Sequence, residues 1–375
     1  MTAFSGRAVY DSGVWDGIAE DVSDFISMIS PSQTPLLAHL GDAPYPAYNV
    51  LHEWLEDELV PDTLTSSGTM INSTSQLSVA VHSRGTSVGN YLCVGTHLKC
   101  DNTGEYMRVT ATSGGTITVA RAQCGTTIAT VMAGYTFTLL GATALEGASV
   151  SDDVSRPRSR KTNYCEIMKK DIIVSGTEQA VTHIGVADEF DRQRTLRQKE
   201  VLRDLEKTVI LGKLTGNTIG SSTNYRTMKG IWDFISTNST SVATLTADGL
   251  NDSMRAAYVY GARDLDLIVA DPVWKQLIDN FTSSRVRQTN DDNRYVSLVT
   301  EFQSSFGDLP VITSQWMPAR SAMVLSTERV NVLPLKGRSF QFEPVSRTGD
   351  AVRGMVLGEY TCEVRNEEGL AKIYG

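Results

Sequence analysis

The sequence lacks the patterns that would place it in or across a membrane. No apolar run approaches the length that spans a bilayer, and the mean hydropathy is −0.16. The start, MTAFSGRAVYDSGVW, has no basic region followed by an apolar stretch, so we expect no secretory signal. With 41% hydrophobic and 21% charged residues, the composition is that of a soluble globular protein. We therefore expect a protein that is made and kept in a cytoplasm, without membrane contact.

Residues that carry most enzyme chemistry are also scarce. The chain has five histidines, scattered along it, and five cysteines, an odd number that favours free thiols in a reducing compartment. It has neither the phosphate-binding pattern GxxxxGK followed by Ser or Thr nor the dinucleotide pattern GxGxxG. The motif search gives no support for an enzyme, and we expect no cofactor.

One short pattern resembles a hydrolase motif. The stretch 85-GTSVG-89 matches the nucleophile elbow around Ser87, which requires a strand before it and a helix after it. The following NYLCVG is strand-like, and no acid shows a clear triad role with His97 or His183. A serine in a β-turn is the favoured interpretation, and a serine hydrolase stays a remote alternative.

A second weak candidate is a zinc site. Cys93, His97, Cys100 and Cys124 are potential ligands, but the spacing C-x₃-H-x₂-C is not a common finger pattern. In a strand, Cys93 and His97 share a face while Cys100 points away. Small buried thiols are the favoured interpretation.

The charge balance argues against tight nucleic-acid binding. The formal net charge is −9, and the single basic cluster, 156-RPRSRK-161, is flanked by Asp152 and Asp153. A solvated loop or a subunit contact is favoured for this cluster. Loose contact with DNA is left open.

The first 82 residues bury little on their own. Residues 1–49 are predicted to be an arm with two short helical pieces, one before Pro31 and one closed by Gly41. The apolar residues of the first piece, at helical spacing, are Val22, Phe25, Ile26 and Ile29. Residues 50–82 are extended, polar and rich in serine and threonine, and 149–177 return in a similar style. These two stretches fit a long hairpin arm that leans on a partner.

Between them, residues 83–148 are predicted to form a β-rich insertion. Strand-turn-strand signals include a hairpin in 106–121 around Ser113-Gly114-Gly115. After 172-IIVSG-176, Ser175 and Glu178 have the spacing of a capping box, so a short helix is expected to begin there.

The stretch 186–211 is predicted to be one long helix. At about 1.5 Å per residue it would be roughly 39 Å long. Val201, Leu205 and Val209 make a narrow apolar stripe that turns polar at Arg194, Arg197 and Gln198. Such a stripe suits a helix that lies across a sheet and exposes its other sides to water or to neighbouring subunits.

Residues 246–345 have the pattern of a compact α/β unit. A helix is expected over 247–262 and a buried strand over 265–271, after which Asp271 and Pro272 begin a second helix. The face of that helix is formed by Trp274, Leu277, Ile278 and Phe281. Strands follow at 309–313, 322–326 and 330–335, and the tail 354–375 reads as two strands around the turn 366–369.

This order of parts resembles a known family. The stretches that carry the likeness are 24-DFISMISPSQTPLLAHLG-41, 53-EWLEDEL-59, 163-NYCEIMKKDIIVSGT-177, 307-GDLPVITSQWMP-318 and 359-EYTCEVRNEEGLAKI-373. Together with the long helix and the α/β unit, they resemble the major capsid protein of tailed double-stranded-DNA bacteriophages, with its α+β Hong Kong-type fold.

The resemblance implies a role for each part. Residues 1–49 would be the N-terminal arm, and 50–82 with 149–177 the extended loop that reaches over a neighbour. Residues 83–148 would be an insertion domain, 178–245 with 341–375 the peripheral domain around its spine helix 186–211, and 246–340 the axial domain. The family implies pentamers and hexamers in an icosahedral shell, scaffold and portal partners, no cofactor, and packaged double-stranded DNA without specific binding.

A second virion part is the main alternative. This would be a tail-tube or decoration protein built on β domains. Neither needs a long helix followed by an α/β unit, so that pair of features favours the capsid protein.

Overall fold

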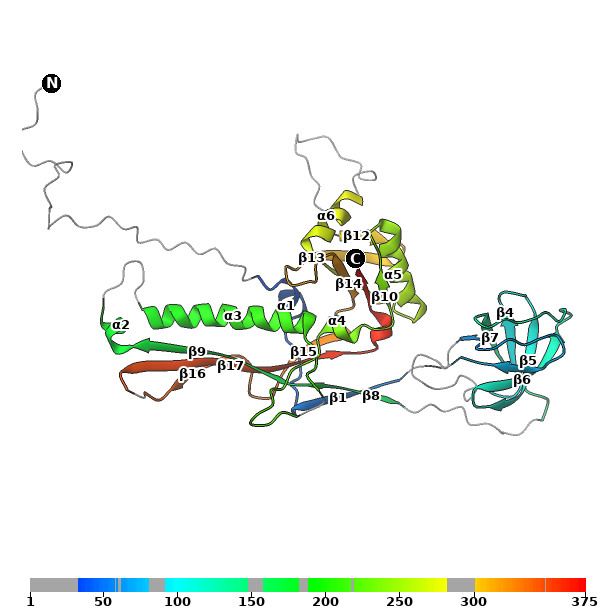
Figure 1. Cartoon of the computed structure of the whole chain (residues 1–375), viewed down its shortest axis with the longest axis horizontal. Coiled ribbons are helices and arrows are strands. Elements are labelled where there is room, and N and C mark those ends of the chain that lie inside the picture. The colour runs from blue at the N-terminus through cyan, green and yellow to red at the C-terminus, as the bar shows by residue number, and fades with distance from the viewer. Residues whose placement is uncertain are drawn as a thin grey trace, which may run out of the picture.

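The computed structural model describes residues 33–57, 59, 62–80, 92–147, 158–181, 188–216, 219–281, 301–347 and 349–375. Figure 1 shows a long helix over a long sheet, an α/β unit at one end of that helix, and a separate β lobe reached by a two-stranded ribbon. No helix in these described ranges is long and apolar enough to cross a membrane. Residues 1–32, including the first predicted helical piece, lie outside them.

The long helix is α3, Glu189–Leu211. It begins at Asp188, whose side chain accepts hydrogen bonds from the backbone N–H groups of Phe190 and Asp191. The predicted stripe is confirmed, because the buried residues are Val201, Leu205, Glu206, Val209 and Ile210. The predicted first residues, 186 and 187, lie outside the described residues.

The sheet beneath α3 is built around one long strand, β17 (Ala351–Val364). β9 (Glu166–Ser175) pairs antiparallel along one of its edges, from Ala351↔Ser175 to Tyr360↔Glu166. β16 (Gln341–Val345) and β15 (Val330–Pro334) pair antiparallel with it as well. α2 (Gly176–Ala180) follows β9, and the predicted cap is confirmed, since the Ser175 side chain accepts from the N–H of Glu178. α3 and the sheet share one apolar core.

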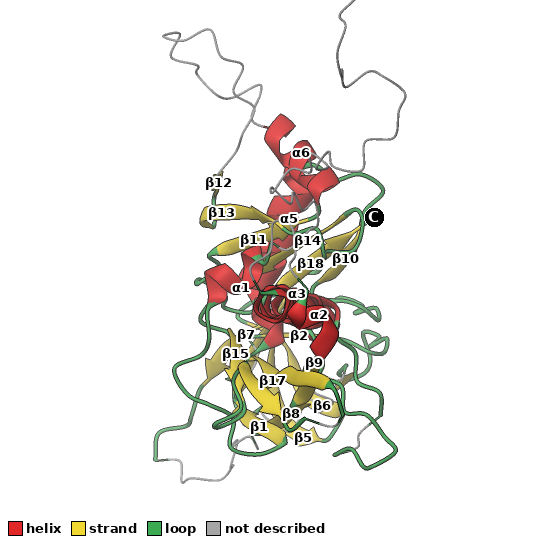
Figure 2. Cartoon of the chain, turned by 90° about the vertical axis from the view of Figure 1, so that its left-hand side faces the viewer, coloured by secondary structure: helices red, strands yellow, loops and turns green. Residues whose placement is uncertain are grey.

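The α/β unit is a six-stranded sheet with helices against it. The strand order is β10-β18-β14-β11-β13-β12, with parallel pairs at β10/β18 and β11/β13. The bounds are β10 Ser239–Ser241, β11 Leu267–Ala270, β12 Glu301–Ser304, β13 Gly307–Thr313, β14 Ser321–Leu325 and β18 Ala371–Tyr374. The helices are α4 Ile231–Phe234, α5 Ala247–Val259 and α6 Pro272–Phe281. Figure 2 looks along α3 and shows it between this unit and the β9/β17 sheet.

Two strands make the ribbon that leads to the β lobe. β1 (Leu51–Glu56) and β8 (Ser159–Tyr164) pair antiparallel from Leu51↔Tyr164 to Glu56↔Ser159. Before them, α1 (Pro35–Leu40) ends at Gly41, which has φ +65°. This is the second helical piece expected in the arm.

The β lobe is a six-stranded antiparallel sheet in the order β2-β7-β4-β5-β6-β3. Its strands are β2 Thr63–Thr65, β3 Gln76–Ser78, β4 Thr96–Cys100, β5 Tyr106–Ser113, β6 Thr116–Gln123 and β7 Thr136–Ala142. The predicted hairpin is present, and Gly114 takes the positive φ, +57°, of a tight turn. The sheet begins at residue 63 and not at the expected 83, because Leu64 and Leu77 are buried in the core of the lobe.

Candidate assembly surfaces

The predicted chemical residues do not form a reactive site in the described structure. Ser87 lies outside the described residues. Cys100 is buried in the core of the β lobe, whereas His97 lies on the other face of β4, with Nε2 3.2 Å from the Thr143 hydroxyl. Cys124 is exposed in a turn and Cys93 is half-buried. Among the residues that the structure describes, no group of three or more His, Cys, Asp or Glu side chains is placed to hold a metal ion.

The basic cluster is part of the ribbon. Within its described part, 158–161, Arg158 lies 3.6 Å from Asp57 and Arg160 lies 3.5 Å from Glu53 on the opposite strand. These pairs are exposed and contribute little to stability. They nevertheless neutralise the arginines, so this segment is not an open cationic patch.

The root of the ribbon is held by a buried carboxylate, Glu363 of β17. It accepts hydrogen bonds from His52 Nε2 at 2.9 Å, from the Tyr45 hydroxyl at 3.2 Å and from Arg365. Burial alone would raise the pKa of Glu363, but the bonds from His52 and Arg365 outweigh it, so its pKa is lowered. The strand that anchors the sheet therefore also anchors the ribbon.

Two further buried polar residues fix the same root. Asn163 donates from Nδ2 to the Cys362 carbonyl (2.6 Å) and to the Lys229 carbonyl (3.0 Å), and its Oδ1 accepts from the Lys229 N–H. Glu56 accepts from the indole of Trp54 and from the N–H of Asn366 (3.1 and 2.8 Å). Because buried polar groups cost free energy when they lose their partners, these contacts define one ribbon position.

The ribbon also exposes apolar side chains. Trp54 faces inward and is buried, whereas its neighbour Leu55 is 60% exposed and Leu59 is 91% exposed. An exposed leucine alone is ordinary. Leu55 on β1, and Leu59 after the end of that strand, offer apolar surface to a partner.

Apolar side chains are also exposed at two separate places on the α/β unit, the end of α5 and, after β11, the start of α6. Val259 is 75% exposed, and Tyr258, Tyr260 and Val273 are partly exposed. Figure 2 shows these two helices at the end of the molecule away from the β9/β17 sheet. Both places are therefore open to a neighbour.

The arm begins at a three-way junction. Glu206 of α3 is fully buried, and its carboxylate accepts from the N–H of Leu37 in α1 (3.4 Å) and from the Ser314 hydroxyl (3.1 Å). Burial raises the pKa of Glu206, and these hydrogen bonds only partly offset that rise. On the same loop, the indole N–H of Trp316 donates to the Gln33 carbonyl (3.2 Å). The spine, the α/β unit and the arm thus meet at Glu206.

Comparison with known proteins agrees with this arrangement of parts. The family model described as SU10 major capsid protein matches residues 4–375, nearly the whole chain. The chain belongs to this family. No protein with a curated description matches it.

Solved structures place this capsid protein in the same fold. A chain of Gordonia phage Cozz is 9% identical, with a TM-score of 0.54, covering 100% of this chain and 98% of that one. The Cyanophage A-1(L) capsid asymmetric unit is 12% identical, with a TM-score of 0.53, covering 95% and 96%. The capsid of an empty GTA particle, computed with C5 symmetry, is 9% identical, with a TM-score of 0.55, covering 98% and 99%. The predicted α+β Hong Kong-type fold is confirmed.

The family and fold settle the broad function. The protein is a major capsid protein that forms a shell from copies of itself, and it is a virion component and not an enzyme. Its functional residues are therefore those that contact other copies of the chain.

The buried polar contacts of this capsid protein were not found from its sequence. Glu206, Asn163 and Glu363 are isolated polar residues, and such residues are usually solvated. For Glu206 a signal did exist, because it lies between Leu205 and Val209 on the apolar stripe of α3. Asn163 and Glu363 gave no comparable signal, since their partners are 199 and 311 residues away in the chain.

Proposed function

We propose that copies of this chain assemble as pentamers and hexamers into an icosahedral phage head that encloses double-stranded DNA. The α/β unit is the axial domain that meets its copies around each symmetry axis. α3 and the β9/β17 sheet form the peripheral domain. The β1/β8 ribbon is the extended loop that crosses a neighbouring subunit, and the arm contacts another. Many individually weak contacts per subunit multiply into a stable shell.

The observation that carries this proposal is the contrast within the ribbon. Its root is fixed by buried hydrogen bonds, yet the side chain of Leu55, between the buried Trp54 and Glu56, is 60% exposed, and that of Leu59 is 91% exposed. A strand held in one position loses little conformational entropy on binding, so Leu55 is preorganised for a partner. The exposed side chains of Val259 and Val273 give the axial unit further apolar positions for contact.

We also propose that the packaged DNA is enclosed without specific binding. The net charge is −9, and the arginines of α3 are paired within the helix. Arg192 pairs with Glu189, Arg194 with Asp191, Arg197 with Glu200 and Arg203 with Asp204. Cations that already have carboxylate partners release few counterions from DNA, so the shell wall holds the genome loosely.

Assembly in the host cytoplasm, with separate scaffold and portal proteins, completes the proposal. The five cysteines are free, which suits a reducing compartment. The β lobe lies beyond the ribbon and is suited to contact a neighbour or the particle surface (Figure 1).

The test replaces both exposed leucines of the ribbon. Leu55→Asp with Leu59→Asp should change the free energy of unfolding by about 0.5 kcal/mol or less, because both side chains are exposed. The same change should abolish or strongly reduce shells, scored by sedimentation and negative-stain microscopy with scaffold supplied. The matched control, Leu55→Met with Leu59→Met, keeps the apolar surface and should assemble normally. Shells of the aspartate variant at wild-type yield would refute the proposed role of the ribbon.

A further inference from the structure

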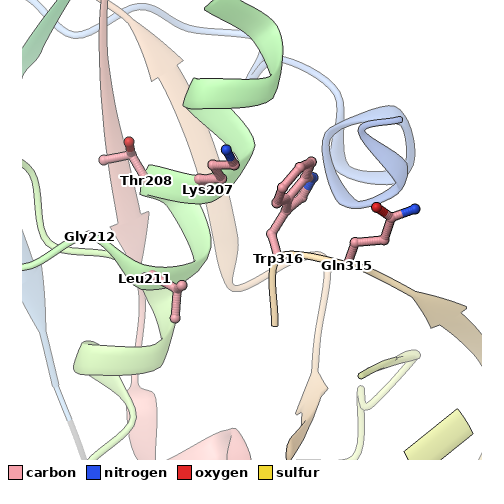
Figure 3. Close-up of a pocket in the computed structure, with 6 residues that line it drawn as sticks. All are labelled: Lys207, Thr208, Leu211, Gly212, Gln315 and Trp316. Atoms are coloured by element: carbon pink, nitrogen blue, oxygen red, sulfur yellow. The ribbon is translucent and has the colours of Figure 1, made fainter. Parts of the chain in front are cut away.

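An open apolar depression lies where α3 ends. It has a volume of about 410 Å³ and is lined by Lys207, Thr208, Leu211, Gly212, Gln315 and Trp316. Figure 3 shows the Leu211 side chain and the Trp316 indole on the two sides of this space. Leu211 is 44% exposed, although it belongs to the helix that forms the core of its domain. The depression therefore offers apolar surface to a further chain segment.

The rim of the depression touches the beginning of the described chain. Trp316 donates from its indole N–H to the Gln33 carbonyl (3.2 Å), and Glu206, next to Lys207, holds α1 at Leu37. Gln33, the first residue that the structure describes, thus lies at the edge of the depression.

The rim also carries a positive charge. The Lys207 ammonium lies 4.2 Å from the centre of the Trp316 ring. A cation over an indole face keeps both its charge and its apolar stem at the surface. An occupant with an acidic residue beside an apolar face would match both features.

The segment 21-DVSDFISMI-29 has this chemistry. At helical spacing, Val22, Phe25, Ile26 and Ile29 share one face, and Asp21 lies four residues before Phe25 on the border of that face. The linker to the rim is Ser30-Pro31-Ser32-Gln33, with serine first and proline second, as a type I turn prefers. So short a linker gives the segment a high effective concentration at the depression.

We propose that residues 21–29 dock as a short helix in this depression of their own subunit. Phe25, Ile26 and Ile29 cover Leu211 and Trp316, and Asp21 pairs with Lys207. The arm is then turned back at its root, and residues 1–20 are the part that reaches a neighbouring subunit.

Crosslinking of the full chain tests the docking and identifies the copy that supplies it. Phe25→Cys and Leu211→Cys are introduced together, with Cys124→Ser to remove the exposed native thiol, and assembled shells are treated with a short bismaleimide. We expect a 25–211 crosslink within one chain, seen by peptide mass and without a dimer band. Co-expressed single variants, one carrying each cysteine, should give no such crosslink.

Two outcomes would overturn the proposal. A dimer band from the co-expressed single variants would mean that a neighbouring copy fills the depression. The second outcome is a yield of the 25–211 crosslink no higher than the yield of the 27–211 crosslink in Ser27→Cys with Leu211→Cys. Ser27 is the control because it lies on the opposite side of the helical pattern.

A charge exchange provides a second readout that needs no crosslinker. Lys207→Glu should speed hydrogen exchange of residues 21–29 by about two- to fivefold, the range expected for one exposed ion pair. Adding Asp21→Lys should restore the wild-type rate. Equal exchange rates in the wild type and both variants would contradict the pairing of Asp21 with Lys207.

Discussion

Glu206 allows a quantitative test of how the arm is attached. Replacing it by alanine removes the acceptor of two donors, the N–H of Leu37 and the hydroxyl of Ser314, both of which lie at a buried junction. A buried donor without a partner costs about 1–3 kcal/mol, so local opening of α1 should become about 2–4 kcal/mol easier. At about 1.4 kcal/mol per factor of ten, amide exchange in residues 35–40 should accelerate by roughly 30- to 700-fold.

Glutamine at the same position is the matched control. Its amide oxygen can accept from Leu37, and its amide nitrogen can donate to the Ser314 oxygen, so the shape and the bonds are kept. Glu206→Gln should therefore alter the exchange of α1 by less than about tenfold, which corresponds to roughly 1.4 kcal/mol.

The stability of α1 should depend on pH differently in the wild type and in Glu206→Gln. Because burial raises the pKa of Glu206, the stability that Glu206 contributes is complete below its unfolded pKa and is lost as the pH rises through its folded pKa. Protection factors of α1, corrected for intrinsic exchange, should fall with rising pH in the wild type and stay level in Glu206→Gln. Wild-type protection of α1 in the alanine variant would refute the assignment of Glu206 as its anchor.

Three other predictions concern the β lobe, the thiols and the spine. In the lobe, Glu105 forms a buried ion pair with Arg121 (2.7 Å). Burial raises the pKa of Glu105, but hydrogen bonds from Arg121 and from backbone N–H groups outweigh burial, so its pKa is lowered. The stability that Glu105 contributes is therefore present above its unfolded pKa and is lost as the pH falls through its folded pKa. Arg121→Met should destabilise the lobe by about 3–5 kcal/mol, measured by hydrogen exchange over 92–147, because it leaves a buried charge unpaired. Cys124 is exposed and should react with a maleimide at pH 8, whereas burial raises the pKa of Cys362 to about 12 and should protect it; equal labelling by mass spectrometry would contradict this. Asp188→Ala should cost the first turn of α3 about 1 kcal/mol, visible as faster exchange of residues 189–192 and not of 205–211.

Local patterns predicted the elements whose signals are complete within a few residues. α6 was predicted from Asp271, Pro272 and an apolar face at i, i+3, i+4 and i+7, and it spans Pro272–Phe281. The spacing of Ser175 and Glu178 predicted the start of α2, and the glycines predicted the turn between β5 and β6. In each case the interactions that form the element lie within a few residues, so the local sequence is enough to predict it.

Short strands with one buried residue gave too little pattern to recognise. β2 and β3 have three residues each, and only Leu64 and Leu77 are buried in them. Their serine- and threonine-rich surroundings resemble a solvated loop, so the β lobe was expected to begin twenty residues later than it does. Pairing with β7 and β6 defines them, and such pairing depends on residues far along the chain.

The assembly surfaces were only partly predictable for the same reason. The resemblance indicated which segments reach other subunits, and the sparse apolar content of 50–82 indicated an incomplete core. That Leu55 faces water while Trp54 is buried follows from the pairing of β1 with β8 and from the anchor at Glu363. No property of the leucine itself distinguishes it.

The position of β17 has a consequence for synthesis on the ribosome. The sheet under α3, the root of the ribbon and, through β18, an inner strand of the six-stranded sheet all require residues 351–374. The β lobe can close as soon as residue 142 has emerged, since its core lies between Leu64 and Phe137. The root of the ribbon and the six-stranded sheet form only after β17 and β18 have emerged, so both are completed later in synthesis than the β lobe.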